Sequence, residues 1–311
     1  MRNFLIVAQQ VAVLFVLMGV GVVCRRTKLV DEPSVRGMVN LLILIVTPCL
    51  IVDCFQRDFD PSMLKGLALA FVIAVSTHIV AIAAACLCVR HWADATQRVL
   101  RVAAVFSNAG FMGIPLEQAV LGDEGVFFGI VYVAVFNLFM WSWGYATMRN
   151  DGRRSLFNRT MFVNPGTIGL AMGLPLFFFS VRLPAFVQTP VHGLASLNTP
   201  LAMLVIGFYL AEARLGAALR MRMLHVAAAL RLLVLPLLLV AALYPFRGSL
   251  NRMMMLALVT AASAPVAAMV SMFAAKFDRD VDASVGIVSG TTLAGIVTMP
   301  VVIAIAMSVL G

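Results

Sequence analysis

Charged residues are scarce in this sequence. Only 12% of its 311 residues are Asp, Glu, Lys or Arg, whereas about 25% is usual in a soluble domain. Hydrophobic residues make up 62% and gather in long runs, of which residues 3–24 are one. Runs of about 20 apolar residues are long enough to span a bilayer, and helices satisfy their own backbone groups there. The sequence therefore predicts an all-α, polytopic membrane protein.

Sequence motifs for several other functions are also absent. No P-loop occurs, which excludes ATP-driven transport of the usual kind. No H-E-x-x-H motif and no pair of intramembrane aspartates occurs, so a membrane-embedded enzyme is not expected. The five cysteines show no CxxC spacing and are predicted to be buried free thiols. We expect neither a metal nor a cofactor.

Ten apolar segments predict ten transmembrane helices. They lie at about residues 4–24, 36–54, 65–89, 99–120, 125–147, 162–181, 191–211, 223–244, 251–274 and 283–309. Of the 23 Lys and Arg residues, 17 fall in alternate connections, beginning with the one after the first segment. Basic loops stay cytoplasmic, so both termini are predicted to lie on the outer side of the cell (inner) membrane. This topology explains the net charge of +9, and no nucleic-acid partner is expected.

Paired prolines indicate an internal repeat. The second and seventh segments contain Thr47-Pro48 and Thr199-Pro200, and the fourth and ninth contain Pro115 and Pro265. The separations nearly match, at 67 and 65 residues. We predict two five-span repeats, 1–148 and 162–311, joined by a short cytoplasmic loop at 149–161. Because five is odd, the repeats would be inverted, as in several secondary transporters. Chance is the alternative, since proline is common in membrane helices.

The stretch "SNAGFMGIP" (107–115) predicts a broken helix within the fourth segment. Pro115 cannot donate a backbone hydrogen bond and should free the carbonyl of Phe111. Gly110 and Gly113 permit unwound backbone and close helix approach. A half-helix N-terminus at such a break suits an anion, and Asn108 could both donate and accept a hydrogen bond. The alternative is a kinked packing helix in which Asn108 bonds to a neighbour.

Motifs along the chain resemble those of the auxin efflux carrier (AEC) family, which includes the PIN-type auxin carriers. "NAGFMGIP" is similar to the family's "NTLVMGIP" stretch, and Asn40 with "LLILIVTPCLI" resembles its second span. "FVNPGTIGLAMGLPLFF" (162–178) and "TPLAMLVIGFYLA" (199–211) resemble its sixth and seventh spans. Residues 273–300 are similar to the end of its ninth span and to its tenth. The resemblance covers nearly the whole chain in order.

The resemblance implies a fold related to sodium/proton antiporters and bile-acid transporters, in which spans 4 and 9 are broken and cross. It implies a scaffold from spans 1, 2, 6 and 7, and a moving transport domain from spans 3, 4, 5, 8, 9 and 10. Plant members carry a Pro-Gln pair in span 9 where this sequence has small residues. The residues that match the family's site, or lie beside it, are Thr47, Pro48, Asn108, Ala109, Gly110, Gly113, Pro115, Ser263, Ala264 and Pro265.

Few ionisable residues could couple transport to an ion gradient. Glu117 follows the broken stretch, and is either a sensor of the crossing or an interfacial carboxylate. Asp53 lies at the outer end of the second segment, where an interfacial position is the alternative to coupling. His78 could titrate near neutral pH or form a structural hydrogen bond. No acidic pair accompanies the crossing, which argues against sodium; proton coupling and uniport stay open.

Three further residues are singled out in the apolar segments. Arg231 is predicted to extend to the cytoplasmic interface, with gating or attraction of the cargo as the alternative. Trp141 is predicted to be an interfacial anchor. Asn137 could reach a central cavity or only bond between helices.

The leading hypothesis for function is a secondary transporter with elevator-like alternating access. The resemblance implies a small organic anion as cargo, either an auxin-like aromatic acid or a dicarboxylate. Membrane lipids are expected neighbours, and a homodimer through the scaffold spans is implied by the resemblance only. The alternative function is a ligand-binding membrane sensor on a transporter fold.

Overall fold

The predicted all-α class is confirmed. The computed structural model describes residues 2–90, 94–149, 165–212 and 222–310, and the regular elements in these residues are all helical. The predicted loop at 149–161 lies outside the described residues except for Arg149. The elements of the first half are α1 (Arg2–Arg26), α2 (Glu32–Leu41), η1 (Leu42–Val46), α3 (Thr47–Cys54), α4 (Pro61–Cys88), α5 (Asp94–Val105), η2 (Ala109–Gly113), α6 (Ile114–Phe139), η3 (Met140–Gly144) and α7 (Tyr145–Met148).

The second half continues with further helices. Its elements are α9 (Pro165–Phe178), α10 (Ala185–Ser196), α11 (Asn198–Glu212), α13 (Arg222–Ala229), η4 (Leu230–Val234), α14 (Leu235–Leu243), η5 (Tyr244–Phe246), α15 (Arg252–Ser263), α16 (Met269–Lys276) and α17 (Val281–Val309). The elements labelled η are short segments of other helix types. Elements η1 to η4 are π-helical turns, and η5 is a 3₁₀ turn.

Seven helical segments of the described chain are long and apolar enough to cross a membrane. The longest, Ala109–Met148, has 40 residues but contains Gly122 at φ 69° and ψ −162°, which is not helical. That glycine lies where the sequence predicts a turn between the fourth and fifth spans. Two shorter apolar helices, Pro165–Phe178 and Arg252–Ser263, lie in the predicted sixth and ninth spans. The count of ten spans stays a prediction.

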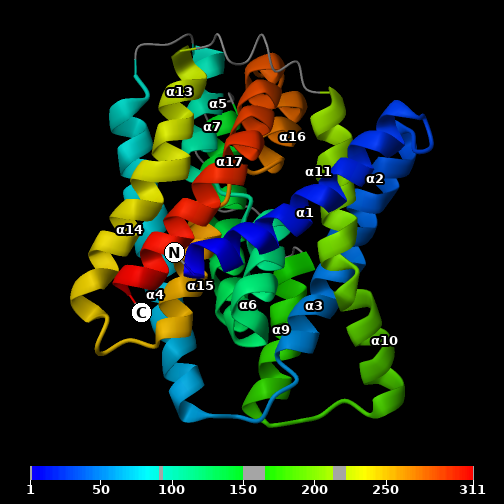
Figure 1. Cartoon of the computed structure of the whole chain (residues 1–311), viewed down its shortest axis with the longest axis vertical. Coiled ribbons are helices and arrows are strands. Elements are labelled where there is room, and N and C mark those ends of the chain that lie inside the picture. The colour runs from blue at the N-terminus through cyan, green and yellow to red at the C-terminus, as the bar shows by residue number, and fades with distance from the viewer. Residues whose placement is uncertain (1, 91–93, 150–164, 213–221, 311) are drawn as a thin grey trace.

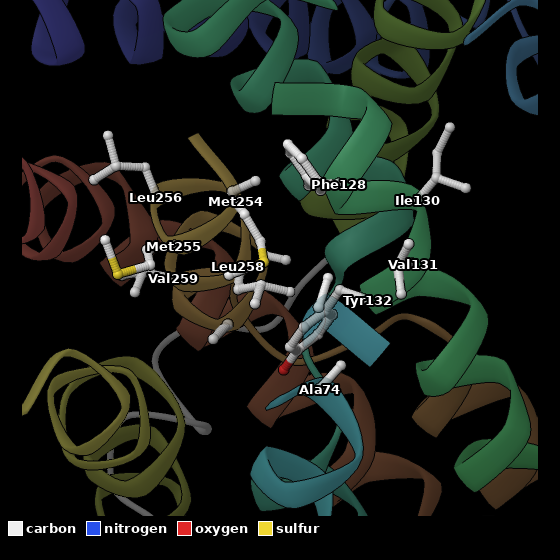
Figure 2. Packing of buried hydrophobic residues seen from close by; sticks show 14 of the residues in the cluster. Ala74, Phe128, Ile130, Val131, Tyr132, Met254, Met255, Leu256, Leu258 and Val259 are labelled. Carbon is white, nitrogen blue, oxygen red and sulfur yellow. The ribbon is translucent and has the colours of Figure 1, made fainter. Parts of the chain in front are cut away.

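Two groups of helices pack closely. In the first, α1 lies along α11, and α3 contacts both α9 and α10; Figure 1 shows α3, α9 and α10 together at the lower right. In the second, α15 packs on α6, which also contacts α4. Figure 2 shows Met254 and Leu258 of α15 on the side that faces Tyr132 of α6, beside Ala74 of α4. These four residues are fully or almost fully buried and belong to the largest apolar core.

Candidate functional site

Two interrupted helices cross at the centre of the molecule. Helix α5 ends at Val105 and η2 begins at Ala109, while α15 ends at Ser263 and α16 begins at Met269. The intervening segments, 106–108 and 264–268, pair antiparallel through an isolated bridge between Ser107 and Val266. We call this pair of segments the crossing. Residues 106–108 and 264–267 are buried, so the pairing supplies partners to backbone groups that water cannot reach.

Two backbone hydrogen bonds hold the crossing. The Asn108 N–H donates to the Pro265 carbonyl at 2.6 Å, and the Ala267 N–H donates to the Phe106 carbonyl at 3.0 Å. Ala264 is extended, at φ −61° and ψ 149°, as expected of a residue before proline. Pro265 therefore accounts for the end of α15.

Pro115 does not interrupt its helix, so the prediction of a break at this proline is wrong. The break precedes it, at residues 106–108, and α6 runs on past Pro115 from the π-helical turn η2. Local π-helical geometry beside a proline can give new partners to the backbone groups that the proline frees. The same order recurs at η1 before Pro48 and at η4 before Pro236.

A cavity of about 210 Å³ lies beside the crossing. Most of its wall is apolar, and no charged side chain of the described chain lines it. Its polar or amphipathic lining residues come from several elements: Thr47 in α3, Ser107 and Asn108 in the crossing, Asn137 in α6, Trp141 in η3 and Asn198 in α11. The cavity thus joins residues that lie up to 230 positions apart in the chain, from Ile43 to Phe273.

Two half-helices begin at the wall of this cavity. Gly110 and Phe111 line it at the start of η2, and Ala268 and Met269 line it at the start of α16. The first N–H groups of a helix have no partner within the helix and carry partial positive charge. The cavity therefore offers two sets of backbone donors to one small ligand.

Several polar side chains at the cavity wall have hydrogen-bonding capacity left. The Asn198 Nδ2 and Ser107 Oγ atoms have no hydrogen-bond partner within the described residues, although both side chains are buried. The Asn108 side chain does not cap η2. By contrast, the Thr47 hydroxyl donates to the Leu42 carbonyl at 2.8 Å and the Asn137 amide to the Val133 carbonyl at 3.0 Å. Unpartnered buried polar atoms are costly unless a ligand or water meets them.

Comparison with known proteins gives the family. The profile of the membrane transport protein family matches residues 6–159 and 153–303. The chain belongs to this family. The match confirms the auxin efflux carrier resemblance that the sequence motifs indicated. A protein of Methanothermobacter thermautotrophicus described as an uncharacterized transporter is 26% identical over 304 residues, covering 92% of this chain and 93% of that protein. The family is one of membrane transporters and not a class of enzymes.

The structure places three of the ten predicted site residues of this transporter at the cavity: Thr47, Asn108 and Gly110. The others lie behind it. Ala264 and Pro265 form part of the crossing, and Ser263 donates to the Thr260 carbonyl at 2.8 Å. Gly113 packs against Ala261 of α15. The remaining three, Pro48, Ala109 and Pro115, do not line the cavity either.

The coupling candidates lie away from the cavity wall. Glu117 is fully buried, and neither carboxyl oxygen has a hydrogen-bond partner within the described residues. It packs so closely on Gly129 that a Cβ atom there would lie 1.7 Å from Glu117 Oε2. His78 Nδ1 is bonded to the Ala74 carbonyl at 2.8 Å, and its ring stacks on Phe139. His78 thus has the structural hydrogen bond that was one of its two alternatives.

Asp53 belongs to a polar cluster between α3 and α10. Its carboxylate accepts a hydrogen bond from Gln188 at 2.6 Å and lies 2.9 Å from His192 Nδ1. The Asp53 side chain is 18% exposed, whereas that of His192 is 72% exposed. These contacts tie two helices together at a site separate from the cavity.

Arg231 is the main residue that the sequence failed to place. The prediction that it extends to the interface is wrong, because its side chain is only 1% exposed. It donates from Nη1 to the Val105 carbonyl at 2.7 Å and from Nη2 to the Ala262 carbonyl. These carbonyls lie at the C-terminal ends of α5 and α15, immediately before the crossing. Nothing in the local sequence names these partners, which are 126 and 31 residues away.

Trp141 and Asn198 also differ from expectation. Trp141 lines the cavity and packs edge-on against Phe273, with ring centroids 5.2 Å apart, rather than serving only as an anchor. Asn198 precedes Thr199-Pro200 and was not predicted from the sequence to be a site residue. The signal in the sequence was a polar amide directly before Thr199-Pro200 within an apolar segment.

Proposed function

We propose that the protein is a secondary transporter for small organic anions and that the cavity beside the crossing is the binding site. The observation that carries this proposal is the meeting of two half-helix N-termini at one cavity, which no charged side chain of the described residues lines. Such ends bind anions through free N–H groups and partial positive charge. The side chains of Asn108 and Asn198 add hydrogen-bonding groups at the same wall.

The apolar part of the wall suits the hydrocarbon part of the cargo. The lining includes Phe111, Phe136, Trp141 and Phe273, which can pack against a ring or a short chain. An auxin-like aromatic acid therefore fits the lining at least as well as a dicarboxylate. The volume of about 210 Å³ favours a small cargo of this kind.

Elevator-like alternating access is the mechanism we propose. The proposed scaffold contributes lining residues from η1, α3, α9 and α11, and the proposed transport domain contributes them from the crossing, α6, η3 and α16. A ligand bound at this boundary would move with the crossing past the fixed scaffold. The inverted five-span repeats, the outer position of both termini, the inner membrane and a scaffold homodimer are parts of the same proposal.

Transport of carboxylates into proteoliposomes tests this function. Currents on a solid-supported membrane, together with tracer uptake for electroneutral exchange, would be measured for indole-acetate, malonate and malate, with and without sodium and a pH gradient. We expect saturable transport of at least one acid. Binding without flux would instead identify a sensor, and the absence of both binding and flux would refute the proposed site.

The Asn108→Ala variant links the activity to the cavity. Loss of one hydrogen bond to a charged ligand should weaken binding by about tenfold or more, while folding stays intact. The matched control is Gln118→Ala, because this change also removes an amide, one that donates to Asp123 at an exposed position away from the cavity. Unchanged affinity in Asn108→Ala would exclude the proposed site.

A further inference from the structure

Arg231 places one fixed positive charge behind the crossing. Its guanidinium group is buried, and no carboxylate of the described chain forms an ion pair with it. The hydrogen bonds that the structure gives it go to backbone carbonyls of α5 and α15. The side chains of Tyr132 and His78 are its other polar neighbours. The buried carboxyl group of Glu117, in α6, makes no hydrogen bond to it.

The partners of Arg231 are the negative ends of two helix dipoles. The C-terminal end of a helix carries about half a negative charge. Val105 is the last residue of α5 and Ala262 the second-last of α15, so one guanidinium group meets two such ends. One positive charge and two negative half-charges cancel. This part of the crossing is then close to electrically neutral.

The positive ends of the other two half-helices are left for the ligand. The N-terminal ends of η2–α6 and of α16 line the cavity, and each carries about half a positive charge. Together they amount to about one positive charge, and no charged side chain of the described chain lines the cavity to alter this sum. Unpartnered Asn198 Nδ2 is a further donor at the wall.

We propose that Arg231 lets the site bind an anion with a single carboxylate, because it leaves about one positive charge at the cavity for the ligand. Arg231 does so by neutralising the carbonyl ends of α5 and α15, which would otherwise oppose an anion at the cavity. It is a positioning and specificity-determining residue that does not touch the ligand. This inference rests on the proposed function and deepens it: Arg231 favours a carboxylate over an uncharged ligand, while a second carboxylate would lose its hydration without gaining a countercharge.

Three matched ligands test the inference by equilibrium binding to the full-length protein in lipid nanodiscs. They are phenylacetamide, phenylacetate and phenylmalonate, which carry no, one and two negative charges at neutral pH. In the wild type, phenylacetate should bind at least about tenfold more tightly than phenylacetamide, which lacks the charge, and than phenylmalonate, whose second carboxylate would be desolvated without a countercharge. Tighter binding of phenylmalonate than of phenylacetate would overturn the inference without any variant. If no ligand binds, the proposed function falls with it.

The Arg231→Gln variant separates a charge effect from a structural one. Removal of a charge through an effective dielectric constant of about 20 should weaken phenylacetate binding roughly tenfold and phenylmalonate binding roughly a hundredfold. Binding of phenylacetamide should not change. Arg231→Lys should keep most of the dependence of affinity on ligand charge, because Lys carries the same positive charge. An equal loss for all three ligands would show a purely structural role and overturn the inference, while leaving the proposed function in place.

A matched control uses another arginine that bonds a carbonyl. Arg279 donates to the Met148 carbonyl at 2.8 Å, outside the crossing. Arg279→Gln should leave the ratio of the phenylacetate and phenylmalonate affinities unchanged. If Arg231→Gln elutes as unfolded protein in size exclusion, Arg231→Lys should still keep the wild-type ratio of phenylacetate to phenylmalonate affinity. A changed ratio in the folded Lys variant would overturn the inference.

Discussion

The pair α1–α11 and the crossing are held together in opposite ways. In the first, continuous helices approach through glycines: a Cβ atom on Gly21 would lie 2.2 Å from the Leu204 carbonyl oxygen, and one on Gly207 would lie 1.9 Å from that of Met18. In the crossing, helices are interrupted and their free backbone groups bond one another and Arg231. Shape determines the first contact, and hydrogen bonds with charge determine the second.

Only the interrupted helices leave backbone groups that could bind a ligand. Small residues let two membrane helices pack closely but leave no backbone group free. An interruption exposes N–H and carbonyl groups, and these must be satisfied by protein or line a cavity. The crossing uses both routes, since its backbone bonds are formed within the protein while the adjoining helix ends face the cavity.

The largest expected effect comes from breaking the glycine contact. Gly21→Leu should destabilise the protein by about 3 kcal/mol, because the added side chain meets rigid backbone. Gly19→Leu is the matched control, since nothing lies within 4 Å of a Cβ atom at exposed Gly19 on the same helix. Thermal unfolding followed by size exclusion measures both. Equal melting temperatures would contradict the close α1–α11 contact.

A second substitution tests whether the region beside the crossing tolerates a clash better. Gly129→Ala places a Cβ atom against the Glu117 carboxyl group, and should destabilise by about 2 kcal/mol. Here the obstacle is a side chain, so adding Glu117→Ala should recover much of the loss. A double-mutant cycle measures this coupling. Additive effects of the two changes would show that the residues do not meet.

Asn198→Ala should affect affinity and stability in opposite directions. The Nδ2 atom has no partner within the described residues, so its removal relieves a buried unpaired donor and should not lower the melting temperature. If Asn198 donates to the cargo, the dissociation constant should rise about tenfold. Binding of phenylacetate and thermal unfolding are measured on the same sample. A lower melting temperature with unchanged affinity would give Asn198 a structural role.

The smallest effect is expected at Pro115. Because the helix is interrupted earlier, at residues 106–108, Pro115→Ala should change the affinity by no more than about twofold. Pro265→Ala should have the larger effect, since Pro265 lies in the crossing and restricts Ala264 to an extended backbone. Titration with phenylacetate compares the two. A greater loss of affinity in Pro115→Ala than in Pro265→Ala would show that Pro115 is essential to the helix interruption.

Hydropathy predicted much of the fold from the sequence. The segment predicted at 283–309 agrees with α17, and that at 36–54 lies within Glu32–Cys54. These segments are long and uniformly apolar, so lipid alone determines that they are helical. The turn between the fourth and fifth predicted spans agrees with Gly122, whose positive φ favours glycine.

The location of the break and the role of Arg231 could not be predicted in the same way. Residues 106–108 contain neither proline nor glycine, and their non-helical backbone pairs with residues 264–268. Arg231 lies in an apolar segment, where extension to the interface is the usual outcome. Its carbonyl partners come from two distant helices. Both features are products of tertiary contact and leave no local pattern.

The hydrogen bonds of the crossing also constrain how the protein is made. The Phe106 carbonyl and the Asn108 N–H take their partners from residues 265–267, which the ribosome produces much later. An unpaired backbone group costs several kcal/mol in hydrocarbon. A nascent first half therefore cannot place this segment stably in lipid by itself. Completion of its membrane insertion must await the second half, so biogenesis of the two halves is coupled.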